Sequence, residues 1–214
     1  MPPTLVIGNK NVSSWSVRPW LALREKGVAF DERVIDLGDP GRHAELRKLS
    51  PQARVPVLID GSRIVFDSLA IMEHVNEAFP GPALLPADAS ARARARSFLA
   101  WMHSGMTELR AHVSFEKTFF PEPIEAPKSA LQEAETLAGA WDAELAASGG
   151  PWLVGSLSLA DLTFVPVLRR LRACRFDLSR WPRARTWADA LWARKSVREW
   201  MEQAERLPPF AGYG

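Results

Sequence analysis

The residues with the clearest chemical meaning are a Val-Pro step and an acidic–hydroxyl pair that follows it in the chain. Residues 52–58 read Gln-Ala-Arg-Val-Pro-Val-Leu, and the Val55-Pro56 bond within them can be cis. A cis bond would turn the backbone N–H and C=O of Val55 outward, where a peptide could pair with them as an added strand. Asp67 and Ser68 open a predicted helix, whose first N–H groups attract an anion. The pattern predicts a site for a short peptide with a carboxylate.

A loop rich in hydroxyl groups precedes the first predicted helix. Residues 9–16 read Asn-Lys-Asn-Val-Ser-Ser-Trp-Ser, so that Ser13, Ser14 and Ser16 lie where the loop meets the helix. A serine here could donate a hydrogen bond to an anion such as a thiolate, and would not act as a base. Helix capping is the structural alternative, with Ser14 or Ser16 as the expected cap because Pro19 suits a first helical turn.

The free energy needed to stabilise a thiolate is comparable to that of one hydrogen bond from a hydroxyl. Lowering a thiol pKa by about two units takes roughly 2.7 kcal/mol. One hydrogen bond to a charged acceptor supplies about 1.5–3 kcal/mol, and a helix N-terminus adds some more. A single serine of this loop could therefore do most of the work of holding a thiolate at neutral pH.

Composition and charge exclude several classes of protein. The 214 residues carry a net charge of +2, which argues against a dedicated nucleic-acid binder. Cys174 is the only cysteine, so no intramolecular disulfide can form, and a reducing cytoplasm is expected. We expect no signal peptide and no membrane span. No metal-ligand spacing, phosphate loop or nucleophile elbow is present in the sequence.

Residues 1–80 predict an α/β domain. Strand patterns cover 4–8, 30–37, 55–59 and 64–66, and helical patterns cover 17–26, 42–49 and 68–79. Gly27 is a good helix stop, and Asp60-Gly61 predicts a tight hairpin between the last two strands. The resulting order, βαβαββα, is that of a thioredoxin-like domain.

A linker and an all-helical domain are predicted next. Pro80-Gly81-Pro82 and Pro86 mark a linker at 81–88. The domain after it, 89–214, has helical patterns at 89–118, 128–147, 158–171 and 183–203. Pro166 is expected to kink the third of these helices.

This arrangement resembles a cytosolic glutathione transferase over nearly the whole chain. Arg54-Val55-Pro56 matches the cis-proline step of that family, and Asp67-Ser68 matches the acidic-Ser pair that grips the γ-glutamyl end of glutathione. Ser158-Leu159-Ala160-Asp161 matches the capping box of the second domain, where it has a structural role. The loop at 9–16 and the run Met102-His103-Ser104-Gly105 resemble a poorly characterised bacterial branch of the family.

The resemblance implies a serine-type enzyme with glutathione as its co-substrate. Glutathione would bind against Val55-Pro56 and Asp67-Ser68, with Arg54 as a partner for a ligand carboxylate and Arg42 near the glycyl end. Both arginines could equally be solvated surface charges. The other implied partners are a small hydrophobic electrophile and a second copy of the chain in a homodimer, without nucleic acid or membrane. The implied role is detoxification in the cytoplasm.

The catalytic serine departs from the family pattern. Counting back from Arg18 puts it at Asn11 in this sequence. Either the loop is shorter here and Ser14, or else Ser13, contacts the sulfur, or Asn11 donates through its amide. The loop holds no tyrosine and no cysteine, so neither of those two types of transferase is available.

Three functions stay open at this point. The first is a glutathione transferase that activates the thiolate through a serine hydroxyl. The second is a glutathione-dependent isomerase or dehalogenase, as in relatives with similar serine loops. The third is a non-catalytic glutathione-binding scaffold that has lost the sulfur contact, an alternative that the Asn11 departure keeps open.

Overall fold

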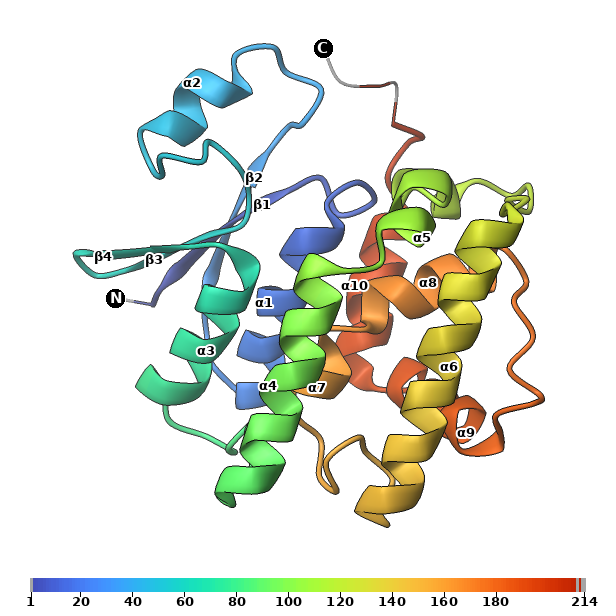
Figure 1. Cartoon of the computed structure of the whole chain (residues 1–214). Helices are drawn as coiled ribbons and strands as arrows, with labels where there is room; N and C mark the ends of the chain where they lie inside the picture. The colour runs from blue at the N-terminus through green and yellow to red at the C-terminus, as the bar shows by residue number, and fades with distance from the viewer. Residues whose placement is uncertain (1, 211, 213–214) are drawn as a thin grey trace. The chain divides into compact units, whose positions relative to one another are not determined.

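The computed structural model describes residues 2–210 and 212 (Figure 1). The chain divides into two compact units, one made of residues 1–82 with 199–214 and the other of residues 83–198. The sequence places 199–214 in the helical domain because its helical pattern continues to 203. In the structure, the described part of this segment packs with the α/β unit instead.

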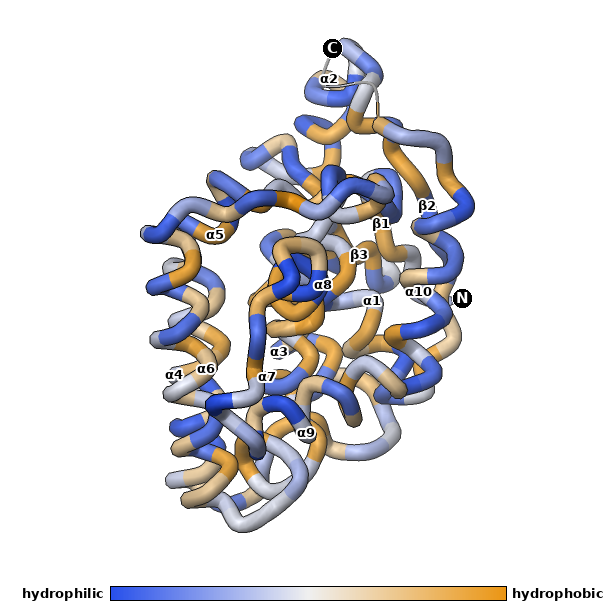
Figure 2. The backbone as a smooth tube through the Cα atoms, turned by 90° about the vertical axis from the view of Figure 1, so that its right-hand side faces the viewer, coloured by the Kyte–Doolittle hydropathy of each residue, from blue (hydrophilic) through white to orange (hydrophobic). Residues whose placement is uncertain are grey.

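A four-stranded mixed sheet forms the centre of the α/β unit. Its strands are β1 (Thr4–Gly8), β2 (Asp31–Ile35), β3 (Val57–Asp60) and β4 (Arg63–Phe66). They lie in the order β2-β1-β3-β4, with β1 and β2 parallel and the other two pairs antiparallel. Gly61, with a φ of 60°, closes the predicted hairpin between β3 and β4. The tube of β1 is mainly hydrophobic in Figure 2, as suits a central strand.

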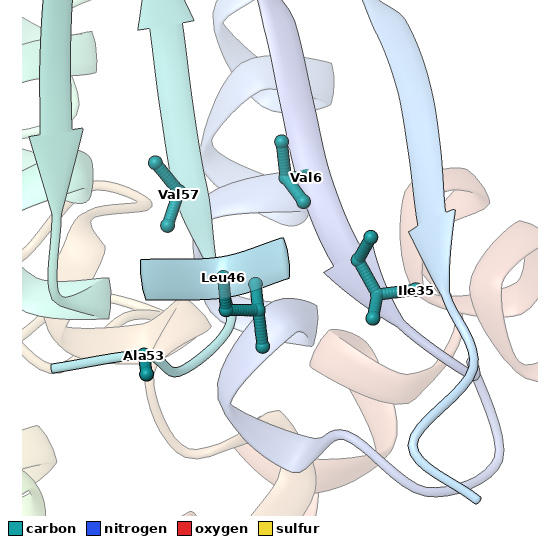
Figure 3. Close-up of a cluster of buried hydrophobic side chains, with 5 residues drawn as sticks. All are labelled: Val6, Ile35, Leu46, Ala53 and Val57. Atoms are coloured by element: carbon teal, nitrogen blue, oxygen red, sulfur yellow. The ribbon is translucent and has the colours of Figure 1, made fainter. Parts of the chain in front are cut away.

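Three helices accompany this sheet, α1 (Ser14–Lys26), α2 (Arg42–Arg47) and α3 (Ser68–Ala78). α1 and α3 pack against each other beside β1, β3 and β4, and Figure 1 shows α2 apart from them. Figure 3 shows Leu46 of α2 over Val6, Ile35 and Val57, which together with Ala53 form one buried cluster. This cluster fixes α2 and the segment after it on the sheet. The order of strands and helices in this unit confirms the predicted thioredoxin-like arrangement.

The second unit is helical, as predicted, but its helices are shorter. They are α4 (Ala89–Ser104), α5 (Thr107–His112), a 3₁₀ turn η1 (Glu116–Phe119), α6 (Lys128–Ser148), α7 (Leu159–Leu162), α8 (Val165–Ala173) and α9 (Pro182–Trp192). The last helix, α10 (Lys195–Glu205), begins in this unit and ends in the α/β unit. In Figure 2, hydrophilic and hydrophobic residues alternate along α6, as expected for a helix with one buried face.

Three of the predicted long helices are wrong in their extent. The helix expected at 183–203 divides into α9 and α10, with residues 193–194 between them. The helix expected at 89–118 stops at Gly105, and Met106 takes a left-handed conformation with a φ of 58°. The helix expected at 158–171 divides into α7 and α8, and Pro166 lies in the first turn of α8 instead of kinking a longer helix. Proline lacks an N–H and therefore fits a first helical turn better than a helix interior.

The buried Asp161 organises the helical unit. Its carboxylate accepts hydrogen bonds from the N–H of Leu153, the N–H and hydroxyl of Ser158, and the indole N–H of Trp187, at 2.8–2.9 Å. The predicted capping box at Ser158 and Asp161 is thus present. Trp187 in turn packs on Trp141 and Phe164. Within the described residues, no helix is long and apolar enough to cross a membrane.

Candidate functional site

The strand registers bring the predicted site residues to one edge of the sheet. Continuing the β1–β3 register by two residues puts Gly8 opposite Val55, and continuing the β3–β4 register by one residue puts Pro56 opposite Asp67. β2 runs parallel to β1 and ends at the same edge. The loop after β1, the segment before β3 and the start of α3 therefore share this edge, although they come from distant parts of the α/β unit.

The segment before β3 has the geometry that the sequence predicts. The Val55–Pro56 bond is cis. Pro56 is buried, Val55 is half-buried and Arg54 is exposed. Ala53, with a φ of 49°, packs in the cluster around Leu46 and anchors the approach to the strand. Val55 lies just outside the β3 ladder, which begins at Val57.

The start of α3 offers a capped helix end and a buried hydroxyl. Asp67 has a φ of 74°, and its side chain accepts hydrogen bonds from the N–H groups of Leu69 and Ala70 at 2.8 and 3.3 Å. Ser68 is 2% exposed, and its hydroxyl has no hydrogen-bond partner among the described residues. A buried hydroxyl without a partner is costly. A ligand that reached this point could supply the missing partner.

Two of the loop serines fix the junction between β1 and α1. Ser13 is the N-cap of α1 and accepts a hydrogen bond from the N–H of Ser16 at 3.3 Å. The two hydroxyl oxygens lie 2.7 Å apart, and the Ser16 hydroxyl also accepts from the N–H of Gly8 at 3.3 Å. The expectation that Ser14 or Ser16 caps the helix is wrong, because α1 begins earlier than its hydrophobic pattern indicates.

Ser14 and Asn11 differ in what holds them. Ser14 is the first residue of α1, is 7% exposed, and accepts a hydrogen bond at its backbone oxygen from the guanidinium of Arg18 at 2.8 Å. That guanidinium also lies 4.4 Å from the centre of the Trp15 ring. The Asn11 amide donates to the backbone oxygen of Pro208 at 2.9 Å. In this structure, the Asn11 amide therefore bonds to the C-terminal tail.

The loop after β1 is also tied to the segment after β2. The Asn9 side chain accepts from the N–H of Leu37 at 2.7 Å and donates to Asp36 at 3.2 Å. A cavity of about 380 Å³ lies here, lined by Asn9, Asn11, Asp36 and, from the tail, residues 207–210. This contribution of the tail has no signal in the sequence, because the contacting residues lie far apart along the chain.

The two arginines predicted to contact a ligand carboxylate are Arg42 and Arg54. Arg42 is the first residue of α2, is half-buried, and donates to the backbone oxygen of Asp39 at 3.0 Å. Arg54 lies next to Val55 but is exposed. Their roles toward a ligand carboxylate stay predictions.

Other reactive groups lie in the helical unit. Burial raises the pKa of the Cys174 thiol, so that less of it is the reactive thiolate at neutral pH. Burial, together with the charge of Arg110, lowers the pKa of the Arg170 guanidinium to about 10. No group of histidine, cysteine and carboxylate side chains within the described residues could hold a metal ion.

Comparison with known proteins agrees with this geometry. Residues 12–78 match the family model "Glutathione S-transferase, N-terminal domain", and residues 111–204 match "Glutathione S-transferase, C-terminal domain". The chain is 34% identical to a maleylpyruvate isomerase from Ralstonia, covering 79% of this chain and 84% of the relative. It is 33% identical to the maleylacetoacetate isomerase of Mus musculus, covering 84% and 83%.

Solved structures show the same fold. A Burkholderia glutathione transferase homologue with bound glutathione is 28% identical, with a TM-score of 0.73. The match covers 97% of this chain and 100% of the homologue. A diazinon-metabolizing glutathione S-transferase from the silkworm Bombyx mori is 21% identical, with a TM-score of 0.80. The match covers 96% of this chain and 98% of the silkworm chain.

Proposed function

Because this chain belongs to the cytosolic glutathione S-transferase family, we propose that it is a serine-type glutathione transferase. Glutathione is its co-substrate and lies along the sheet edge, with its peptide backbone against Val55-Pro56. Its γ-glutamyl end lies at Asp67-Ser68. A hydroxyl at the start of α1 holds its sulfur as a thiolate, and the thiolate attacks a small hydrophobic electrophile.

The observation that carries this proposal is the buried Ser68 hydroxyl. It has no partner within the described part of the chain, and it sits at the first residue of α3 beside a carboxylate that already caps the helix. Leaving such a group unpaired costs about 1–3 kcal/mol, which a bound carboxylate would recover. The charged amino group of the γ-glutamyl residue would in turn meet Asp67.

Ser14 is the serine that best fits the contact with the sulfur. Ser13 and Ser16 have hydroxyls that bond each other, and Ser16 also bonds the N–H of Gly8. Ser14 occupies the first position of α1, directly after the N-cap Ser13, where the N–H groups of the helix end are closest to a bound anion. A thiolate there would gain a hydrogen bond of about 1.5–3 kcal/mol and a smaller contribution from the helix N-terminus.

The chemistry then needs no further cofactor. The thiol proton leaves to solvent, and the sulfur lone pair forms a C–S bond with the electrophilic carbon. In a displacement, the leaving group departs with its bonding electrons. In an addition, the electrons move onto the activating group, which takes up a proton. This chemistry requires reduced glutathione, so we place the protein in the cytoplasm, and we propose a homodimer as in other members of the family.

Glutathione-dependent isomerisation is the second candidate, because relatives at 33–34% identity are named maleylacetoacetate and maleylpyruvate isomerases. In that reaction the thiolate adds to a conjugated double bond, the resulting single bond rotates, and the thiolate leaves again. Glutathione is then regenerated, whereas a transferase consumes it.

Turnover with purified protein tests the proposal. The protein is incubated with glutathione and either a chlorinated nitroaromatic electrophile or maleylacetone, and glutathione and products are quantified. Consumption of glutathione supports the transferase, and isomerisation without consumption supports the second candidate. Activity that falls in Ser14→Ala and persists in Ser16→Ala assigns the serine. Calorimetric binding of glutathione without turnover of either compound would support the non-catalytic scaffold instead.

A further inference from the structure

Lys10 is a nearly buried cation in the loop that carries the site serines. It is 8% exposed, and its ammonium forms an ion pair with Glu32 of β2 at 2.6 Å. The same ammonium lies 5.2 Å from the centre of the Trp20 ring and 5.1 Å from that of Trp200. Lysine is rarely buried unless its charge is matched. A carboxylate and two ring faces match it here.

The box around Lys10 is closed by two residues of α10. Gln203 accepts a hydrogen bond from the Lys10 ammonium. The indole N–H of Trp200 donates to the backbone oxygen of Lys10 at 3.2 Å, and the Trp200 ring packs edge-on against Trp20 at 5.3 Å. Both the side chain and the backbone of Lys10 are thus fixed by α10. Glu32 is fixed as well, because the indole N–H of Trp20 donates to it at 2.6 Å.

We propose that Lys10 is a positioning residue, and that its box of Trp20, Glu32, Trp200 and Gln203 sets the path of the loop at residues 9–14. The loop continues directly from Lys10 to Asn11, Ser13 and Ser14. Fixing Lys10 from both sides therefore fixes where the hydroxyls of the loop can point. The end of α10, which follows the helical unit in sequence, becomes part of the glutathione site in the α/β unit.

This inference deepens the proposed function and rests on it for its catalytic consequence. Its structural consequence does not depend on glutathione, so the test measures both. Amide hydrogen exchange of residues 9–14 in ligand-free protein reports whether the box holds the loop. Turnover with glutathione reports whether holding the loop matters for catalysis, through kcat separately from KM.

Four variants make up the test. Lys10→Met removes the charge and keeps the length of the stem, and Lys10→Arg restores a cation. Trp200→Phe keeps a ring but removes the hydrogen bond to the backbone of Lys10, and it serves if Lys10→Met fails to fold. Arg33→Met is the matched control. Arg33 lies next to Glu32 on β2, and its replacement breaks only an exposed ion pair with Glu45.

The expected result has two parts. Lys10→Met and Trp200→Phe speed up exchange at residues 9–14 and lower kcat about 10-fold, a modest loss of transition-state stabilisation, with KM for glutathione changed less than threefold. Lys10→Arg recovers most of kcat, and Arg33→Met changes neither measurement.

The inference is overturned if exchange at residues 9–14 is unchanged in both Lys10→Met and Trp200→Phe. It is also overturned if exchange rises while kcat stays at the wild-type level. If the wild-type protein shows no turnover, only the proposed function is overturned. The exchange data then decide whether the box around Lys10 holds residues 9–14.

Discussion

The hydroxyl oxygens of Ser13 and Ser16 lie 2.7 Å apart and join the end of β1 to the start of α1. Each has a further backbone partner, since Ser13 accepts from the N–H of Ser16 and Ser16 accepts from the N–H of Gly8. Ser13 and Ser16, which look equivalent to Ser14 in sequence, thereby have a structural role at this junction.

These hydrogen bonds predict different stabilities for the three alanine variants. Ser13→Ala removes an N-cap and should cost about 1 kcal/mol of the free energy of unfolding. Ser16→Ala leaves the buried N–H of Gly8 without its acceptor and should cost about 1–3 kcal/mol. Ser14→Ala should cost less than Ser16→Ala, because alanine keeps the backbone oxygen that accepts the hydrogen bond from Arg18. Urea unfolding of the three proteins measures this, and a Ser14→Ala variant less stable than Ser16→Ala would contradict the assignment.

Ser68→Ala should separate binding from stability. The Ser68 hydroxyl is buried without a partner among the described residues, so its removal should leave the free energy of unfolding equal or slightly higher. Glutathione affinity should fall about 10-fold, the equivalent of one hydrogen bond of about 1.4 kcal/mol. Thermal unfolding and calorimetry on the same samples test both. A variant that is clearly less stable, with unchanged affinity, would show that Ser68 has a structural role only.

Asp67 should respond to substitution in a complementary way. Asp67→Asn keeps a side-chain oxygen that can accept from the first N–H groups of α3, so stability should change little. Asp67→Ala loses the cap and should cost about 1 kcal/mol. Both variants lose the charge that would meet the amino group of glutathione, so both should bind glutathione more weakly. Equal affinities for wild type and Asp67→Asn in calorimetry would show that the charge of Asp67 does not contribute to glutathione binding.

Asp161 should matter for folding and leave the chemistry intact. Asp161→Asn replaces one carboxylate oxygen with an amide NH₂ that must face two donors, and we expect a loss of about 2–4 kcal/mol in the free energy of unfolding. The kcat of the protein that remains folded at low temperature should equal that of wild type. A selective loss of kcat without loss of stability would mean that the capping box has another role.

Cys174 should be slow to react. Burial raises the pKa of its thiol, so the thiolate fraction at neutral pH is smaller than for an ordinary cysteine. Alkylation of Cys174 by iodoacetamide should therefore be slower at pH 7 than alkylation of free cysteine. Its rate should continue to rise at pH values where the rate for an ordinary thiol has become constant. Mass spectrometry of the intact protein over time gives the rate. Rapid alkylation at pH 7 would contradict the burial argument.

The sequence was sufficient for the features that depend on local pattern. The four strands, the cis bond at Val55-Pro56 and the capping box at Ser158 are each written in a few neighbouring residues. The shared edge of the sheet follows from the thioredoxin-like order, because that order decides which strand ends meet. The helix boundaries at Ser14 and Met106 were missed, since polar residues and an isolated glycine inside a helical pattern do not show where a helix begins or ends.

The contacts that decide how the loop is held could not be read from the sequence. Lys10 meets Trp200 and Gln203, and Asn11 meets Pro208, across nearly the whole length of the chain. Periodicity reports which face of α10 is buried, but not which residue covers it. For the same reason the choice among three serines needed the hydrogen bonds of Ser13 and Ser16, which only the folded chain provides.

The most direct test of the central claim is the thiol pKa of glutathione bound to the wild-type protein. The ultraviolet absorbance of the thiolate is recorded against pH at saturating glutathione, with Ser14→Ala measured in parallel. We expect an apparent pKa about two units below the value of about 8.5 for a free thiol, and a return most of the way to that value in Ser14→Ala. Glutathione that binds the wild-type protein with an unshifted thiol pKa would contradict the claim that this site activates the sulfur.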